Sequence, residues 1–218
     1  MGKVIELDKA VSTIASGATV MVGGFMGCGN PHTLVDALVA TGTTGLTLIC
    51  NDASFPGYGV AKLVEARRLR RLIASHIGLN PAVAEQMNAG DLEVELIPQG
   101  TLAERIRCAG AGLGGVLTPA GVGTPVAEGK RTVEVGGRWY LLEEPLRADV
   151  ALINGHRIDP NGNVWYRGTT RNFNPVMATA ADLVIAEADL VVAIGDIPPE
   201  DVVTPGVLVD LVVRGRAS

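Results

Sequence analysis

Short apolar segments alternate with amphipathic segments along the first half of this 218-residue chain. Strands that alternate with helices are typical of a parallel sheet, because each parallel connection needs a crossover and the crossover is usually a helix. The chain is therefore predicted to fold as an open, mostly parallel α/β sheet with flanking helices. The predicted strands are Thr19 to Val22, Leu46 to Ile49, Arg71 to Ala74 and Val94 to Ile97, and the predicted helices are residues 33–40, 60–68, 81–88 and 101–108.

The pattern changes after residue 108, where a glycine- and alanine-rich segment begins. Gly136-Gly137 then joins two short apolar runs, and a two-glycine connection of this kind is a hairpin signature. We expect an inserted β-hairpin around residues 132–142 within a single domain of residues 1–218, a length that one core can fill. Further strands are predicted at Asp149 to Ile153, Leu183 to Ala186, Leu190 to Ile194 and Val207 to Val213, with a helix near Pro175 to Ala180.

Two helix starts carry local signals. Asn80-Pro81 combines a good N-cap residue with proline in the first turn. Thr101, with Glu104 three residues later, has the spacing of a capping box. The sequence therefore predicts helices that begin at or just after these positions.

Composition argues against several classes of protein. The formal net charge of −5 is mild and basic residues are scattered, which does not suit a nucleic-acid surface. The three cysteines are odd in number and widely spaced, as in a reducing cytoplasm, and they do not form a zinc set. No targeting segment is expected, because no apolar run follows a basic start at the amino terminus. No membrane span is expected either, because glycines and a proline punctuate the uncharged stretch of residues 11–35. We expect a cytoplasmic protein.

Familiar catalytic motifs receive little support. Residues 110–115 satisfy the dinucleotide fingerprint Gly-x-Gly-x-x-Gly, but a helix is predicted before them where that motif needs a strand. The phosphate-binding Gly-x-x-x-x-Gly-Lys-Ser/Thr is absent. The three histidines are isolated, so ordinary polar roles are favoured over metal binding, and a nucleophilic pair of Cys108 with His76 has no supporting context. No metal is expected.

The glycine-rich segment after the first strand is the best candidate for a ligand-binding loop. Residues 19–32 read Thr-Val-Met-Val-Gly-Gly-Phe-Met-Gly-Cys-Gly-Asn-Pro-His. Glycine allows backbone amides to approach a ligand closely, and Pro31 marks the turn into the next helix. In parallel sheets, ligands bind at the carboxyl ends of the strands, where this loop is expected to lie.

This loop resembles the first signature of the family I coenzyme A transferases, which include succinyl-CoA:3-oxoacid, 3-oxoadipate and acetate/acetoacetate CoA-transferases. The resemblance spans nearly the whole chain. It continues through residues 48–52 (Leu-Ile-Cys-Asn-Asp), 74–78 (Ala-Ser-His-Ile-Gly), 98–107 (Pro-Gln-Gly-Thr-Leu-Ala-Glu-Arg-Ile-Arg), 117–124, 147–149, 171–175 (Arg-Asn-Phe-Asn-Pro) and 203–206.

The resemblance implies a ping-pong reaction that moves coenzyme A between carboxylic acids through a glutamyl-CoA thioester. In the family, the reacting glutamate belongs to the B subunit, within a Ser-Glu-Asn-Gly type of sequence that this chain lacks. The chain resembles only the A (alpha) subunit, so its expected partner is a B subunit, in a heterodimer or heterotetramer that is active only when assembled. Acyl-CoA and carboxylic acids are the implied substrates; coenzyme A thioester acts as substrate, and no permanently bound cofactor is expected.

The same resemblance assigns roles to individual residues. Gln99 would donate its side-chain amide to the substrate acid, although it could instead cap the helix predicted to begin near Thr101. The other residues expected at the site are Gly23, Gly24 and Phe25 beside the acyl group, Asn51 as a polar contact, and Gly27 and Gly29 as contacts to coenzyme A.

Two departures from the family pattern favour the acetate/acetoacetate branch. Asp52 stands where many 3-oxoacid enzymes have a second asparagine, and residues 76–78 differ from the 3-oxoadipate type. A negative charge at Asp52 would repel a second substrate carboxylate.

A 3-oxoadipate or succinyl-CoA:3-oxoacid enzyme remains an alternative. Another is a non-catalytic sensor of a sugar phosphate or other small ligand, although such regulators carry a helix-turn-helix segment. A self-sufficient hydrolase or isomerase comes third.

Overall fold

A mixed sheet forms the centre of the molecule in the computed structural model, which describes residues 2–216. The eight-stranded sheet has the order β11-β10-β8-β1-β2-β3-β4, and β9 pairs antiparallel with β8 beside this path. The pairs along the path are parallel, which confirms the predicted fold class. The strands are β1 (Thr19–Val22), β2 (Leu46–Ile49), β3 (Leu69–Ala74), β4 (Glu93–Leu96), β8 (Ala148–Ile158), β9 (Val164–Trp165), β10 (Ala181–Val191) and β11 (Leu211–Arg214). The domain predicted for residues 1–218 also includes Met1, Ala217 and Ser218, which lie outside the described residues.

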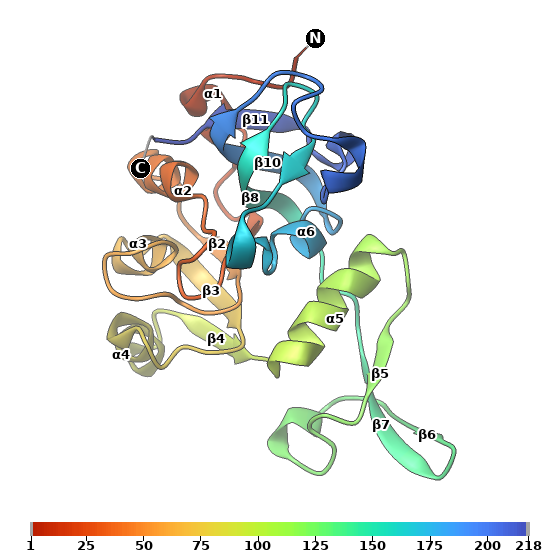
Figure 1. Ribbon diagram of the computed structural model, residues 1–218. Coiled ribbons are helices and arrows are strands. Elements are labelled where there is room, and N and C mark those ends of the chain that lie inside the picture. Colours follow the sequence, from red (N-terminus) through yellow and green to blue (C-terminus); the bar gives the residue numbers. More distant parts are fainter. Residues whose placement is uncertain (1, 217–218) are drawn as a thin grey trace.

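Helices cover both faces of this sheet (Figure 1). Side chains alternate along β1, so that Val20 and Val22 pack into one apolar cluster with α1 to α4, while Met21 packs into a second cluster with α5 and α6. Two separate cores therefore flank the sheet. The α-helices are α1 (Leu7–Val11), α2 (His32–Ala40), α3 (Ala61–Glu65), α4 (Pro81–Ala89), α5 (Gln99–Gly110) and α6 (Asn174–Met177), and short 3-10 helices cover Pro125–Ala127, Gly168–Arg171, Pro199–Asp201 and Gly206–Leu208.

A second, three-stranded sheet stands apart from the central one, beyond α5 (Figure 1). We call residues 116–143 the flap. Its strands are β5 (Val116–Thr118), β6 (Thr132–Val135) and β7 (Arg138–Glu143), in the order β5-β7-β6. Gly136 and Gly137 have φ values of 59° and 75°, the positive range that a two-residue hairpin turn requires. The predicted hairpin is confirmed, and β5 was not predicted.

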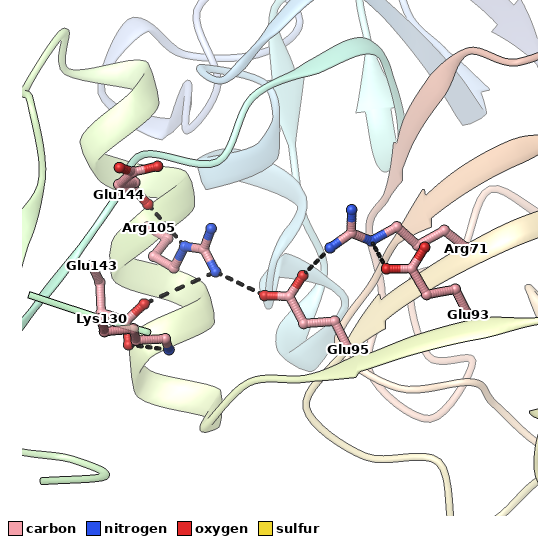
Figure 2. Close-up of polar contacts among 7 residues, drawn as sticks. All are labelled: Arg71, Glu93, Glu95, Arg105, Lys130, Glu143 and Glu144. Atoms are coloured by element: carbon pink, nitrogen blue, oxygen red, sulfur yellow. Dashed lines mark hydrogen bonds and ion pairs between the residues drawn. The ribbon is translucent and has the colours of Figure 1, made fainter. Parts of the chain in front are cut away.

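Charged side chains connect the flap to the body (Figure 2). Arg105 on α5 lies 3.2 Å from Glu95 on β4, and its Nε donates to the carbonyl oxygen of Glu144 at 2.8 Å. Within the flap, Lys130 pairs with the buried Glu143 at 2.6 Å. Arg105 thus contacts both the sheet edge and the segment that leaves the flap.

Several predicted elements, among them the following four, differ in extent from the observed ones. The strands predicted at Leu183 to Ala186 and Leu190 to Ile194 are one strand, because β10 stays paired with β8 from Ala181 to Val191. The strand predicted at Val207 to Val213 is shorter, since a 3-10 turn after Pro205 occupies Gly206–Leu208 and β11 begins only at Leu211. The helix predicted at Pro175 to Ala180 is the single turn α6.

The two predicted helix starts have opposite outcomes. Asn80 caps α4 through a hydrogen bond from the backbone N–H of Ala82 at 3.2 Å, as its sequence indicates. The capping box at Thr101 is wrong, because α5 begins at Gln99 and Thr101 lies buried inside its first turn. Glu104 pairs instead with Arg107, at 2.8 Å.

Candidate functional site

The predicted site residues lie at one edge of the central sheet. Because β1 to β4 are parallel, the loops that follow them meet at their carboxyl ends. The glycine loop (residues 23–31) follows β1, Asn51 and Asp52 follow β2, and Gln99 follows β4 at the first turn of α5. The fold therefore brings together residues that are far apart in the sequence.

A pocket of about 410 Å³ opens beside Gln99. Its walls combine apolar side chains with two side-chain amides, and none of the lining residues is titratable. They are Phe25, Gln99, Gly100, Ala103, Asn172, Phe173 and Val176. Such a pocket can enclose a short apolar group and orient a polar one through neutral hydrogen bonds.

Gln99 is the outermost member of a buried polar chain. Its Nε2 donates to Asn51 Oδ1 at 2.6 Å, and Asn51 Nδ2 donates in turn to Asp52 Oδ2 at 2.7 Å. Asn51 is only 2% exposed, so it reaches the pocket through Gln99. The alternative that Gln99 caps α5 is not what the structure shows, since Gln99 is the first helical residue and its amide points to Asn51.

Close packing explains the first two glycines of the loop. A Cβ on Gly23 would overlap the side chain of Asn174, and a Cβ on Gly24 would overlap that of Asn30. Both asparagines are buried and hold the loop: Asn30 Nδ2 donates to the carbonyl of Gly23 at 2.5 Å, and Asn174 Nδ2 donates to that of Gly29 at 3.0 Å. Gly23 and Gly24 are themselves buried.

The other predicted loop residues occupy different positions. Phe25 is 42% exposed and lines the pocket. Gly27 is buried, and a Cβ there would overlap the ring of Tyr58. Gly29 is partly exposed and lies against the backbone of Thr170. Both glycines thus have a packing role, and their expected contact with coenzyme A stays a prediction.

The sequence reasoning assigned no role to residues 172–176, which form one wall of the pocket. Asn172 Nδ2 donates to the carbonyl oxygens of Cys28 and Thr169 at 3.0 and 2.8 Å, and Phe173 and Val176 line the pocket. The available signal was the Asn-Phe-Asn-Pro run at 172–175, since asparagines flanking an aromatic residue suit a loop that binds backbone groups.

Two buried glutamates already have partners. The carboxylate of Glu187 on β10 accepts from the backbone N–H groups of Thr33 and Leu34, at 3.1 and 2.8 Å, and so caps α2. Burial raises the pKa of Glu187, although these two hydrogen bonds oppose that shift. Glu143, 2% exposed, is paired with Lys130. Both carboxylates therefore stabilise the fold through these contacts.

Among the described residues, the remaining candidate groups have other surroundings. Within residues 2–216, no set of three His, Cys, Asp or Glu side chains is placed to hold a metal ion. Cys108 is 1% exposed within α5, and His156 pairs with Asp189 at 3.0 Å. In that same range, none of the helices combines the length and apolar character needed to cross a bilayer.

Large apolar side chains are exposed on the glycine loop and on the loop after β2. Phe25, Met26, Phe55 and Tyr58 have exposed fractions of 42%, 40%, 40% and 48%. Clustered exposed apolar side chains are typical of an interaction surface. We call these four residues the apolar rim.

Comparisons with known proteins agree with this architecture. The family model described as coenzyme A transferase matches residues 4–215. The alpha subunit of the acetate CoA-transferase of Escherichia coli K12 is 50% identical, and that of the acetoacetyl-CoA:acetate/butyrate CoA transferase of Clostridium acetobutylicum is 48% identical; the alignments cover 99% of this chain and 98% and 99% of theirs. The corresponding chain of the 3-oxoadipate CoA-transferase of Pseudomonas putida is 47% identical over 95% of this chain and 91% of its own.

A solved structure shows the same fold. The acyl-CoA transferase YdiF of E. coli O157:H7, crystallised as a thioester complex with CoA, superposes with a TM-score of 0.86 at 23% identity. The match covers 98% of this chain and 47% of that one, so this chain spans about half the length of YdiF.

Proposed function

The chain belongs to the coenzyme A transferase family, and we propose that it is the A subunit of a two-subunit enzyme that moves coenzyme A between short-chain acids. The proposed acids are acetate or butyrate on one side and acetoacetate or another 3-oxoacid on the other. The relatives named as alpha subunits of acetate and acetate/butyrate transferases support this choice.

The pocket beside Gln99 is the observation that carries the proposal. Its apolar walls suit a short acyl chain, and its size suits a small group better than the whole of coenzyme A. Gln99 Nε2 uses one N–H on Asn51 and keeps the other for the pocket, where it can donate to a carboxylate or thioester oxygen. A fixed neutral donor stabilises charge that develops on such an oxygen during acyl transfer.

The partner subunit is proposed to supply the nucleophile. Its glutamate would attack the acyl-CoA, form an acyl-glutamyl anhydride with release of the CoA thiolate, and then become a glutamyl-CoA thioester as the carboxylic acid leaves. The second acid reverses these steps. The structure is compatible with this division, because the two most deeply buried glutamates of this chain cap α2 and pair with Lys130.

The apolar rim supports a shared site. It borders the glycine loop whose Phe25 lines the pocket, so a partner that covers the rim would also close the pocket from water. Exclusion of water strengthens the hydrogen bonds inside such a site. We propose a heterodimer or a heterotetramer of two A and two B chains; the cytoplasmic location stays a prediction.

Replacement of Gln99 by alanine tests the function. We expect kcat/KM of the assembled enzyme to fall about 10- to 100-fold, because a donor to the reacting oxygen is lost. Asn88→Ala is the matched control, since Asn88 is an exposed amide residue on α4. Both variants should co-purify with the partner subunit. Full activity of a correctly assembled Gln99→Ala enzyme would refute the role of Gln99.

The alternative within the family is an enzyme for dicarboxylic acids. The 47% identity to a 3-oxoadipate subunit is close to the 50% and 48% of the acetate relatives, so identity alone does not separate the two branches. Rates with acetate and with succinate as acceptor acids distinguish them. The family match gives no support to the alternative of a non-catalytic sensor.

A further inference from the structure

Asp52 determines the direction of the hydrogen bonds that lead to the pocket. It is 5% exposed, and three donors converge on its carboxylate: Met26 N–H and Asn51 Nδ2 on Oδ2, at 2.8 and 2.7 Å, and Ser54 N–H on Oδ1, at 2.8 Å. A carboxylate that is ionised only accepts hydrogen bonds. The amide nitrogen of Asn51 must therefore face Asp52.

The orientation of the Asn51 amide in turn fixes that of the Gln99 amide. With its nitrogen turned to Asp52, Asn51 presents Oδ1 to Gln99, and Ser75 Oγ also lies 3.3 Å from that oxygen. Gln99 must then turn its own nitrogen to Asn51. The pocket receives the remaining N–H of Gln99 and its carbonyl oxygen, which is a paired donor and acceptor.

We propose that Asp52 is a positioning residue that makes the site selective for monocarboxylic acids, by fixing the orientation of the Asn51 and Gln99 amides. This rests on the proposed transferase function. Because the one free N–H of Gln99 serves the reacting oxygen, a second substrate carboxylate at Gln99 would meet its carbonyl oxygen, which repels it. If both amides were reversed, Gln99 would offer two N–H groups to the pocket, a geometry that suits a carboxylate. The selectivity thus depends on the direction of hydrogen bonds, whereas the sequence suggested repulsion by the charge of Asp52 itself.

Asp52→Asn should reverse the orientation of the Asn51 and Gln99 amides. An asparagine at 52 has one acceptor oxygen, so it can satisfy Ser54 N–H or Met26 N–H but not both in the present geometry. Ser54 is completely buried, whereas Met26 is 40% exposed, so loss of the hydrogen bond to Met26 N–H is the less costly of the two. The oxygen should therefore stay with Ser54, which places the new amide nitrogen toward Asn51 and turns the Asn51 nitrogen to Gln99.

The experiment compares acetate with succinate as acceptor acids, with acetoacetyl-CoA as donor and the assembled A/B enzyme. Asp52→Asn is expected to raise the ratio of kcat/KM for succinate to that for acetate by about tenfold, the size expected when a repulsive contact is replaced by one hydrogen bond. In a Gln99→Leu background, the same change should leave the ratio within about twofold, because no amide remains to reverse.

Two kinetic outcomes would overturn the proposal. One is an unchanged or lower ratio in an active Asp52→Asn enzyme. The other is an equal rise with and without Gln99, which would mean that removal of the charge acts by itself.

A neutron structure of the deuterium-exchanged wild-type complex shows the orientation of the Asn51 and Gln99 amides directly, and it requires neither a variant nor an active enzyme. Deuterium on Gln99 Nε2 directed at Asn51 Oδ1 is the expected result, and the reversed arrangement would overturn the proposal even in an active transferase. If the wild-type complex showed no transfer with either acid, the proposed function would fail, and the neutron result would still decide the orientation of the amides.

Discussion

Single side chains hold the glycine loop in its shape, and Gly23 shows the principle most clearly. Its φ is not in the left-handed region, so backbone freedom does not explain the glycine. The explanation is the neighbouring Asn174 side chain, whose Oδ1 accepts from Asn154 N–H at 3.0 Å and whose Nδ2 donates to Gly29 and Thr170. The shape of the glycine loop and the position of the 172–176 wall of the pocket thus both depend on the Asn174 side chain.

Gly23→Ala is predicted to destabilise the protein by about 2–4 kcal/mol. The added methyl group must displace Asn174, which breaks buried hydrogen bonds in addition to overpacking the site. Equilibrium unfolding in urea measures the effect. Gly114→Ala is the control, because no atom lies within 4 Å of its added Cβ and its φ is ordinary. Equal stability of the two variants would show that the Asn174 contact is unimportant.

At the residue scale, the sequence predicted which residues lie close together better than it predicted the hydrogen bonds that they make. It predicted Gln99, Phe25 and Asn51 at one site, and the structure brings them to one edge of the sheet. It did not identify Asn172 or Asn174, and it treated Asp52 as a charge near the substrate. Those roles depend on which backbone groups lie next to each side chain, and local sequence does not contain that information.

Helix α2 and the flap are each stabilised by groups from other elements. α2 begins after Pro31 without a cap from its own segment, and Glu187 on β10 supplies the acceptor. Arg105 on α5 supplies the corresponding link for the flap (Figure 2). In both cases a charged group fixes one element against another.

Glu187 should give the protein a measurable pH dependence. Its pKa is raised in the folded state, mainly by burial, so its favourable contribution is fully present below the ordinary carboxyl pKa of 4.5 and is lost as the pH rises through the raised value. The free energy of unfolding of wild type should therefore decline over this interval more than that of Glu187→Gln. Glu85→Gln, at an exposed position on α4, is the control. Identical pH profiles for wild type and Glu187→Gln would contradict the assignment.

Loss of Arg105 should loosen the flap. Arg105→Met keeps much of the apolar stem but removes the contacts with Glu95 and the Glu144 carbonyl, and it leaves the buried Glu143 with fewer opposite charges. We expect a loss of about 2–4 kcal/mol in the free energy of unfolding and faster protease cleavage within the flap. Arg107→Met, two residues further along α5 in an exposed pair with Glu104, should change neither measurement. Equal effects of both changes would contradict this role.

The sequence predicted elements with strong local patterns and missed those that depend on distant partners. The strands β1 and β2, the cap at Asn80 and the turn at Gly136-Gly137 follow from periodicity and local chemistry. β5 is only three residues long and exists because β7 lies beside it, and the single strand β10 reflects its long pairing with β8. The helix start predicted at Thr101 is wrong because a capping signal is weaker than the packing that buries this residue.

At the scale of the whole molecule, the pocket beside Gln99 opens next to the apolar rim, and Phe25 belongs to both. In the proposed enzyme, the short apolar cavity, the neutral amide and the exposed aromatic side chains bind and orient substrate while a partner completes the site. The fold class followed from the alternation of strands and helices. The need for a partner came from the resemblance to alpha chains of the family, and the relatives named as alpha subunits agree with it.

The position of the covalent intermediate tests this division of roles most directly. The assembled enzyme would be incubated with acetoacetyl-CoA without acceptor acid, digested under acidic conditions and examined by mass spectrometry for a peptide that carries coenzyme A on a glutamyl side chain. This division of roles predicts that the peptide comes from the partner chain and that the chain described here remains unmodified. A glutamyl-CoA thioester on this chain would contradict it.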